Sequence, residues 1–532
     1  MLFNSYIFIF LFLPITLLGF HLIGSQGRHR VALAWLVAAS LFFYGWWNPA
    51  YLGLILGSML FNYAVGVALS ARAVNRPADP PPHSRLQPAK LILIAGIAAN
   101  LGLLGYYKYA NFFVANLNAL FGSSLVLETI ILPLAISFFT FQQIAYLVDA
   151  YRGETHEYSF LHYALFVVFF PQLIAGPIVH HHEMLPQFAR STLYRLKAEH
   201  LAVGLTIFAL GLFKKVVLAD GVAIYATPVF DAAQAGTALT FFEAWGGALA
   251  YTFQLYFDFS GYSDMAIGLA RMFGVRLPLN FNSPYQATSI IDFWRRWHIT
   301  LSRFLRDYLY IPLGGSRKGE ARRLTNLLIT MLLGGLWHGA GWTFVLWGGL
   351  HGFYLVINHA WRQWRTRRGH TQSSRLGRFF GWLLTMLAVV IAWVPFRAEG
   401  MAATQNMLGA MFGMNGISLP SSLDGRLGVF QPWLESLGVV FSGMFGNGLA
   451  NWNSGIYWIV FLAGVSALLP NTQQIMLHYH PALETYNGEI LKMKYGWLEW
   501  RPTPLWAIIG GLIFYLAFIH LTRVSEFLYF QF

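Results

Sequence analysis

The sequence predicts an all-α, polytopic integral membrane protein with about 11–13 membrane elements, including broken, re-entrant and interfacial helices around a central cavity. Hydrophobic residues make up 56% of the 532 residues and charged residues 11%, and the mean hydropathy is +0.51. A soluble domain of this length does not have such a composition. The chain contains no cysteine, which excludes a thiol nucleophile, disulfides and cysteine-ligated metal.

The first apolar run, residues 1–24, is expected to stay as a transmembrane helix. It lacks the preceding positive charge and the small-residue cleavage site of a secretory signal. Arg28 and Arg30 follow it, and the positive-inside rule places them in the cytoplasm. Further spans are predicted at about 51–71, 90–107, 129–148, 159–179, 200–226, 240–270 and 504–522.

Two interruptions of the apolar pattern carry their own expectations. The loop after residue 71 contains Arg72, Arg76, Arg85, Lys90, Pro77, Pro80, Pro81 and Pro82. Prolines at this density favour an extended linker over a folded domain. Lys214 and Lys215 interrupt an apolar run, which predicts either two helical pieces or one helix whose end extends its lysines to the interface.

The chain is organised around residues 294–352, where a basic, aromatic segment leads into an apolar stretch that contains His338. The apolar stretch, residues 324–357, would be about 51 Å long as one helix, too long for a core of about 30 Å. Gly339-Ala340-Gly341 is the natural break, and it places His338 at a helix end roughly 21 Å deep. The alternative is a neutral histidine whose ring nitrogens bond neighbouring helices. The break, together with glycines at positions 335, 339, 348 and 352 that allow close helix packing, favours a functional histidine in a walled cavity.

The formal net charge of +13 is largely explained by membrane orientation, with one exception. The exception is a cluster between residues 295 and 323, which contains more positive charge than the orientation of the neighbouring helices in the membrane would require. Its basic members are Arg295, Arg296, Arg303, Arg306, Arg317, Lys318, Arg322 and Arg323, and they alternate with Trp294, Trp297, Phe304, Tyr308 and Tyr310. Two interpretations stay open: an interfacial segment that binds anionic lipid headgroups, or a cytoplasmic mouth that binds a phosphorylated donor such as a coenzyme A thioester.

Other polar residues are weaker candidates. Asp258 and Asp264 are six residues apart and point to different helical faces, so joint acid–base work is not expected. Pairing with Arg295 or Arg296, or stabilising a helix break, is the preferred role for these carboxylates. Residues 180–183 (HHHE) suggest a metal site, but consecutive histidines do not converge on one helical face, so interfacial polar residues are the preferred interpretation. No glycine-rich phosphate loop or nucleic-acid-binding module is present in the sequence.

Several motifs make the chain recognisable. They are residues 175–177 (AGP), 256–265 (YFDFSGYSDM), 280–285 (NFNSPY), 294–298 (WRRWH), 306–315 (RDYLYIPLGG), 335–339 (GLWHG) and 396–398 (FRA). On these residues the chain resembles the membrane-bound O-acyltransferase (MBOAT) family, in the branch of the bacterial alginate O-acetylases. The resemblance implies an MBOAT-like membrane core over residues 1–400, with the catalytic stretch at 250–360. Residues 401–532 are then an extension with an external loop at about 414–454 and the final transmembrane helices.

The resemblance implies an O-acyltransferase that passes acetyl from cytoplasmic acetyl-coenzyme A across the bacterial inner membrane, for O-acetylation of an exported, alginate-like or other polysaccharide. A periplasmic acetyltransferase or acceptor protein would be the partner, and no cofactor or metal is expected to be bound permanently. His338 and His298 are the expected catalytic residues, although His298 alone would also suit a helix cap. The expected donor-binding or cavity residues are Trp294, Arg295, Arg296, Trp297, Arg303, Arg306, Tyr308, Trp337, Asp258, Ser260, Asp264 and Asn280. The alternative from another class is a transporter or channel that uses an intramembrane histidine as a proton relay.

Overall fold

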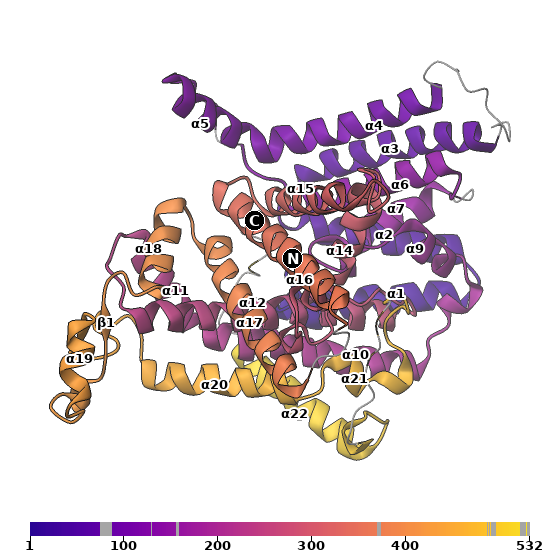
Figure 1. Cartoon of the computed structure of the whole chain (residues 1–532). Helices are drawn as coiled ribbons and strands as arrows, with labels where there is room; N and C mark the ends of the chain where they lie inside the picture. Colours follow the sequence, from indigo (N-terminus) through magenta and orange to yellow (C-terminus); the bar gives the residue numbers. More distant parts are fainter. Residues whose placement is uncertain are drawn as a thin grey trace. The chain divides into compact units, whose positions relative to one another are not determined.

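The computed structural model confirms an all-α, multi-pass membrane protein (Figure 1). It describes residues 1–74, 88–128, 130–155, 159–369, 374–486, 488, 490, 496–521 and 528. Among these described residues, five helical segments are long and apolar enough to cross a membrane: Phe8–Ser25, Tyr51–Arg72, Pro88–Phe121, Ala198–Gln234 and Arg375–Arg397. Three shorter helices are also apolar: His29–Gly45, Trp452–Leu468 and Pro504–His520. The larger number of 11–13 membrane elements stays a prediction, and the proline-rich linker with Arg76 and Arg85 lies outside the described residues.

The chain forms two compact units, and the first consists of residues 1–212, 262–280 and 472–530. Its main helices are α1 (Leu13–Ser25), α2 (His29–Gly45), α3 (Tyr51–Val74), α4 (Pro88–Leu104), α5 (Ala110–Phe121), α6 (Ile136–Arg152), α7 (Phe160–Val168), α8 (Phe170–Leu173), α9 (His181–Phe188), α10 (Ala198–Phe213), α21 (Thr472–Ile475) and α22 (Pro504–His520). Aromatic rings from distant parts of the sequence form its core. Phe43 of α2 and Phe170 of α8, for example, have ring centroids 5.5 Å apart. The last helix is at the predicted place.

The predicted span at 159–179 is wrong in its second half. The helix α7 ends at Val168, because Phe169 takes an extended ψ of 107°, and only the four-residue α8 follows. Pro171 is the second residue of α8, in the first turn, where its missing N–H costs nothing. Gly176 and Pro177 then continue as non-helical chain up to His180. Proline cannot donate the backbone hydrogen bond that a continued helix would need.

The second unit consists of residues 213–261, 281–471 and 531–532, of which the last two lie outside the described residues. Its helices are α11 (Asp220–Gln234), the first part of α12 (Phe241–Met272), α13 (Ile290–Arg296), α14 (Ile299–Leu305), α15 (Glu320–His338), α16 (Trp342–Arg367), α17 (Arg375–Arg397), α18 (Met401–Met411), α19 (Phe430–Ser436) and α20 (Trp452–Leu468). Within the loop predicted at 414–454, β1 (Ile417–Ser418) pairs in parallel with β2 (Val439–Val440). The contacts group residues 401–471 with this unit and 472–521 with the first, while the division at residue 400 stays a prediction.

At Lys215 the structure shows neither two helical pieces nor a lysine that extends to the interface, the two predicted alternatives. One helical segment runs from Ala198 to Gln234, and a π-helical turn over Lys214–Ala219 keeps it continuous. The Lys215 side chain is buried, and its Nζ lies 2.8 Å from carboxylate oxygens of both Asp220 and Asp258. Because the two carboxylates satisfy the ammonium inside the protein, this lysine does not need to extend to the interface.

Glycines bring α15 and α16 together as an antiparallel hairpin. A Cβ added at Gly335 would overlap the carbonyl oxygen of Phe344, and one added at Gly348 would overlap that of Met331. At Gly352 the added atom would lie 2.8 Å from a methyl group of Leu328. The close packing expected from the glycine spacing is therefore present, and it places the end of α15 at the tip of the hairpin.

Candidate active site

His338 is the last residue of α15, as the sequence predicted. Gly339 and Gly341 are both extended, with φ of −159° and −163°, and α16 begins at Trp342. A Cβ at Gly339 would overlap the ring of Phe344, so the turn needs glycine for close approach rather than for an unusual backbone angle. The helix break thus presents the imidazole of His338 at the tip of a tightly packed hairpin.

The surroundings of His338 are aromatic. Its ring centroid lies 5.0 Å from Trp347 of α16 and 5.2 Å from Phe396 of α17, both at steep interplanar angles. Trp337, the preceding residue, is 4.9 Å away. The imidazole is 6% exposed. These aromatic walls therefore bury the imidazole and keep water away from most of its surface.

His298 lies near His338, as expected for a functional pair. The two ring centroids are 6.5 Å apart with an interplanar angle of 57°, and His298 is 1% exposed. The ring of Phe259 in α12 meets His298 edge-on at 4.8 Å. The structure therefore brings together two buried histidines that are forty residues apart in the sequence.

The backbone of His298 is held in an uncommon conformation. Its φ and ψ are 42° and 54°, in the left-handed region, at the N-cap position of α14. Its side chain makes no capping hydrogen bond. His298 therefore occupies the N-cap position but does not stabilise the start of α14 as a capping side chain would. Non-glycine residues in this region cost of order 1–3 kcal/mol and concentrate at functional sites. The observed strain therefore favours the functional interpretation of His298.

A third histidine, His351 of α16, was not predicted from the sequence. Its imidazole is fully buried, and the indole N–H of Trp294 donates to its Nδ1 at 3.3 Å. Trp347 connects it to the pair, with a ring centroid 4.9 Å from His351 and 5.0 Å from His338. The available signal was the same as for His338, an ionisable side chain inside the apolar stretch 324–357.

The tryptophans of residues 294–298 have different roles. Trp294 is half-buried and reaches the histidines through His351. Trp297 is buried, with ring centroids of Phe281 and Trp393 each 5.0 Å away, and thus belongs to the aromatic core behind the pair. Its expected donor contact stays a prediction.

The basic cluster is mostly at the surface. Arg296 is half-buried and pairs with Asp292 at 2.9 Å, and Arg306 pairs with Asp307 at 2.7 Å. The hydrogen bond that Arg306 donates to the Asp307 carboxylate raises the pKa of the Arg306 guanidinium above its ordinary value. Arg303 and Tyr308 are half-buried. Arg295, Arg317, Lys318 and Arg322 are exposed and form no ion pair with any described residue. These four cations are open to an anionic ligand.

The expected pairing of Asp258 with Arg295 or Arg296 is wrong. Asp258 is buried and pairs with Lys215 instead, while Arg296 pairs with Asp292. The lysine was the missed residue, because its 43-residue separation from Asp258 leaves no local pattern. Asp258 precedes Phe259, the ring that meets His298, so the ion pair anchors this part of α12. Ser260 is buried on the same helix.

The remaining predicted residues, Asp264 and Asn280, belong to the first unit. Asp264 accepts a hydrogen bond of 2.6 Å from the hydroxyl of Thr472, and the Asn280 amide donates to Ser263 at 3.2 Å. These contacts hold loops against α12. A cavity of about 980 Å³ in the same unit is lined by apolar residues of α1, α10 and α22. The central cavity around His338 stays a prediction.

Comparison with known proteins agrees with the motifs. The profile of the membrane-bound O-acyltransferase family matches residues 126–396, which include both His298 and His338. The chain is 47% identical to a peptidoglycan O-acetyltransferase of Helicobacter pylori over 79% of this chain and 81% of the relative. It is 44% identical to a probable alginate O-acetylase of Pseudomonas aeruginosa over 77% and 75%. A teichoic acid D-alanyltransferase of Bacillus subtilis is 28% identical over 49% of this chain and 65% of the relative.

The match covers the helix break, the strained His298 and the basic cluster that precedes α15. Together with the identity to two kinds of O-acetylating enzyme over most of the chain, it leaves one conclusion. The chain belongs to the membrane-bound O-acyltransferase family and is an O-acyltransferase.

Proposed function

We propose that this enzyme transfers an acetyl group from acetyl-coenzyme A to a hydroxyl of a cell-envelope or exported polysaccharide, or to a periplasmic acetyltransferase that completes the transfer. The names of two kinds of relative, a peptidoglycan O-acetyltransferase and alginate O-acetylases, support an acetyl group and a polysaccharide. The observation that carries the proposal is the buried pair of His298 and His338 at the tip of a helical hairpin.

In the proposed reaction the acceptor hydroxyl attacks the thioester carbonyl directly. A C–O bond forms, the C–S bond breaks, the hydroxyl proton passes to a nitrogen of His338, and a proton returns to the coenzyme A thiolate. An oxygen about 3 Å from one nitrogen of each ring fits the 6.5 Å separation of the ring centroids of His298 and His338. Because the chain has no cysteine, no acyl-cysteine intermediate is available. In this scheme His338 is the general base and His298 holds the hydroxyl.

The donor is proposed to bind at the cytoplasmic face of the inner membrane, because acetyl-coenzyme A is made in the cytoplasm. Exposed Arg295, Arg317 and Lys318 supply cations for its phosphates. This orientation has a simple test, because the chain has no native cysteine and Ser316 is exposed. A Ser316→Cys protein should resist an impermeant thiol reagent added outside intact cells. Labelling from outside would contradict the orientation.

The function is tested with purified, detergent-solubilised enzyme, radiolabelled acetyl-coenzyme A and a polysaccharide or short glycan acceptor. Wild type should release coenzyme A thiol and produce an O-acetyl ester in the absence of any ion gradient, whereas His338→Ala should do neither. The matched control is His478→Ala, which removes an exposed histidine of the first unit. A transporter with His338 as a proton relay would release no coenzyme A thiol and would acetylate neither the glycan nor an added periplasmic acetyltransferase, and that result would overturn the proposal.

A further inference from the structure

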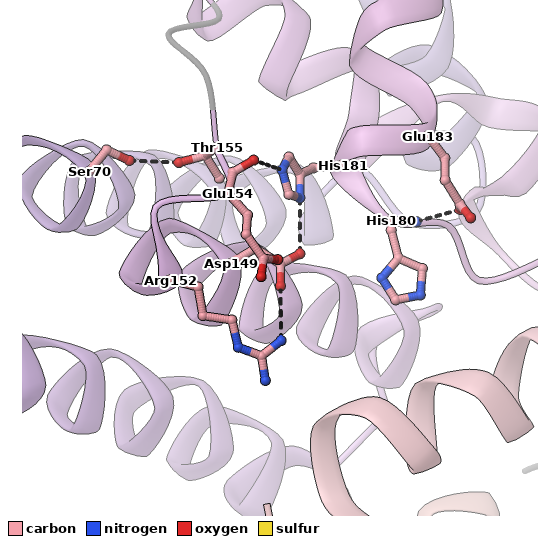
Figure 2. A network of polar contacts seen from close by, with 8 residues as sticks. All are labelled: Ser70, Asp149, Arg152, Glu154, Thr155, His180, His181 and Glu183. Atoms are coloured by element: carbon pink, nitrogen blue, oxygen red, sulfur yellow. Dashed lines mark hydrogen bonds and ion pairs between the residues drawn. The ribbon is translucent and has the colours of Figure 1, made fainter. Parts of the chain in front are cut away.

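A second histidine cluster lies in the first unit, apart in sequence from the proposed catalytic pair, and Figure 2 draws Asp149, His180 and His181 of this region. Asp149 of α6, His180 and His182 each direct one ligand atom into a common region, with these atoms within 4.8 Å of one another. Asp149 and His180 are buried and His182 is exposed. One carboxylate oxygen and two imidazole nitrogens form a ligand set typical of Zn²⁺ and related divalent transition metals.

The backbone explains how nearby histidines converge. His180 is not helical: its φ and ψ are −99° and 149°, at the N-cap position of α9. Its backbone N–H donates to the carboxylate of Glu183 at 3.0 Å, which fixes this entry to the helix. The rings of His180 and His182 consequently lie with their centroids 5.4 Å apart. The expectation that these histidines diverge assumed a helix over all of them, and it is wrong for His180 and His182. Their role as interfacial polar residues stays a prediction.

The carboxylate of Asp149 is oriented by its neighbours. Nδ1 of His181 lies 3.0 Å from Oδ2 of Asp149, and Nε2 of His181 lies 3.2 Å from the carbonyl oxygen of Glu154 (Figure 2). Such contacts to a ligating carboxylate orient it and tune metal affinity. The Arg152 guanidinium lies 3.8 Å from Oδ1 of Asp149, and its side chain is 38% exposed. It is therefore able to move away if a metal cation takes its place.

We propose that Asp149, His180 and His182 bind one divalent transition-metal ion of the zinc class, which ties the end of α6 to the start of α9. Bonds of about 2.0–2.1 Å would place tetrahedral ligand atoms about 3.4 Å apart. The cluster, whose ligand atoms are up to 4.8 Å apart, must therefore contract by up to about 1.4 Å, and the exposed His182 can supply this by changing its rotamer. Three protein ligands leave a fourth position for water, and the exposure of His182 provides an entry path.

The test is metal binding and needs no acyl transfer, so its result is independent of the proposed function. Tag-free, full-length protein in detergent is stripped with a chelator and titrated with Co²⁺ while its visible absorption is recorded, and Zn²⁺ is then added. Wild type should bind one equivalent of Co²⁺ and release it to Zn²⁺. His182→Ala should weaken Co²⁺ binding more than 100-fold, and His181→Asn about 10–100-fold, because a ligand counts for more than a residue that orients one.

His478→Ala is the control, since His478 is an exposed histidine of the same unit outside the cluster. It should retain the Co²⁺ absorption of wild type. Because His182 is exposed, its replacement by alanine should not disturb the packing of the core. Folding of each variant is checked by size-exclusion chromatography. Absence of saturable Co²⁺ binding, or equal affinity in His182→Ala and wild type, would show an ion-pair network only and overturn the proposal.

Discussion

The two histidine clusters differ in what surrounds the imidazole rings. His298 and His338 contact the rings of Phe259, Trp347 and Phe396, whereas His180 and His182 share their region with the carboxylate of Asp149. An apolar wall excludes water from the group that acts as a general base. A carboxylate completes the donor set that a divalent cation requires. The same residue type therefore serves different chemistry, and the neighbouring helices decide which.

The largest expected effect separates the two clusters. His338→Ala should lower kcat by about 10²–10⁴-fold, the usual contribution of a general base, while Co²⁺ binding stays at one equivalent. His182→Ala should lose Co²⁺ binding. Steady-state acetyl transfer and Co²⁺ titration are measured on the same preparations. Loss of the metal in His338→Ala, or normal transfer by that variant, would remove the distinction between the clusters.

The second largest effect is expected at the buried ion pair of Lys215 and Asp258, which should contribute to the stability of the protein. Lys215→Met leaves Asp258 buried without its ammonium partner, which should destabilise the protein by about 3–5 kcal/mol. The double variant Lys215→Met/Asp258→Leu should recover much of this loss, because the more deeply buried carboxylate is then removed and Asp220, the second partner of Lys215, is partly exposed. Unfolding in detergent is followed by circular dichroism, with exposed Lys318→Met as the control. Equal stability of the single and double variants would contradict the ion-pair account.

A smaller effect is expected at the hairpin that positions His338. Gly348→Ala would push a methyl group into the carbonyl oxygen of Met331, while the methyl of Gly349→Ala meets Leu332 at an ordinary 3.5 Å. The first should cost about 1–3 kcal/mol and lower kcat, and the second should change neither quantity appreciably. The two glycines are neighbours on α16, so the pair is a matched comparison. Equal losses would mean that the close packing of α15 and α16 does not position His338.

The smallest effect concerns the donor. Arg295 is exposed, so its contact with a phosphate should contribute about 0.2–1 kcal/mol, which corresponds to at most about a fivefold rise in KM for acetyl-coenzyme A in Arg295→Gln. KM should also rise with salt in wild type and rise less steeply in the variant. Initial rates at several salt concentrations measure both. An unchanged salt dependence would assign Arg295 to lipid headgroups instead.

The helix break and the buried histidine could be predicted because each leaves a local pattern. A 34-residue apolar stretch cannot span as one helix, and Gly339 marks where it stops. Long-range pairings could not be predicted in this way. Lys215 pairs with Asp258, which is 43 residues away in the sequence. His180 lies near Asp149 because the backbone of His180 is extended at the N-cap position of α9. Burial of a lysine, and convergence of adjacent histidines, depend on helices that the sequence does not place relative to each other.

The central claim, that His298 and His338 act on one reacting group, is tested most directly by a double-mutant cycle. Single-turnover acetyl transfer is measured for wild type, His298→Ala, His338→Ala and the double variant. If both rings contact the same hydroxyl, the effects are strongly non-additive, and the double variant is about as slow as His338→Ala alone. Rate losses that multiply in the double variant would show that the two histidines act independently and would contradict the account.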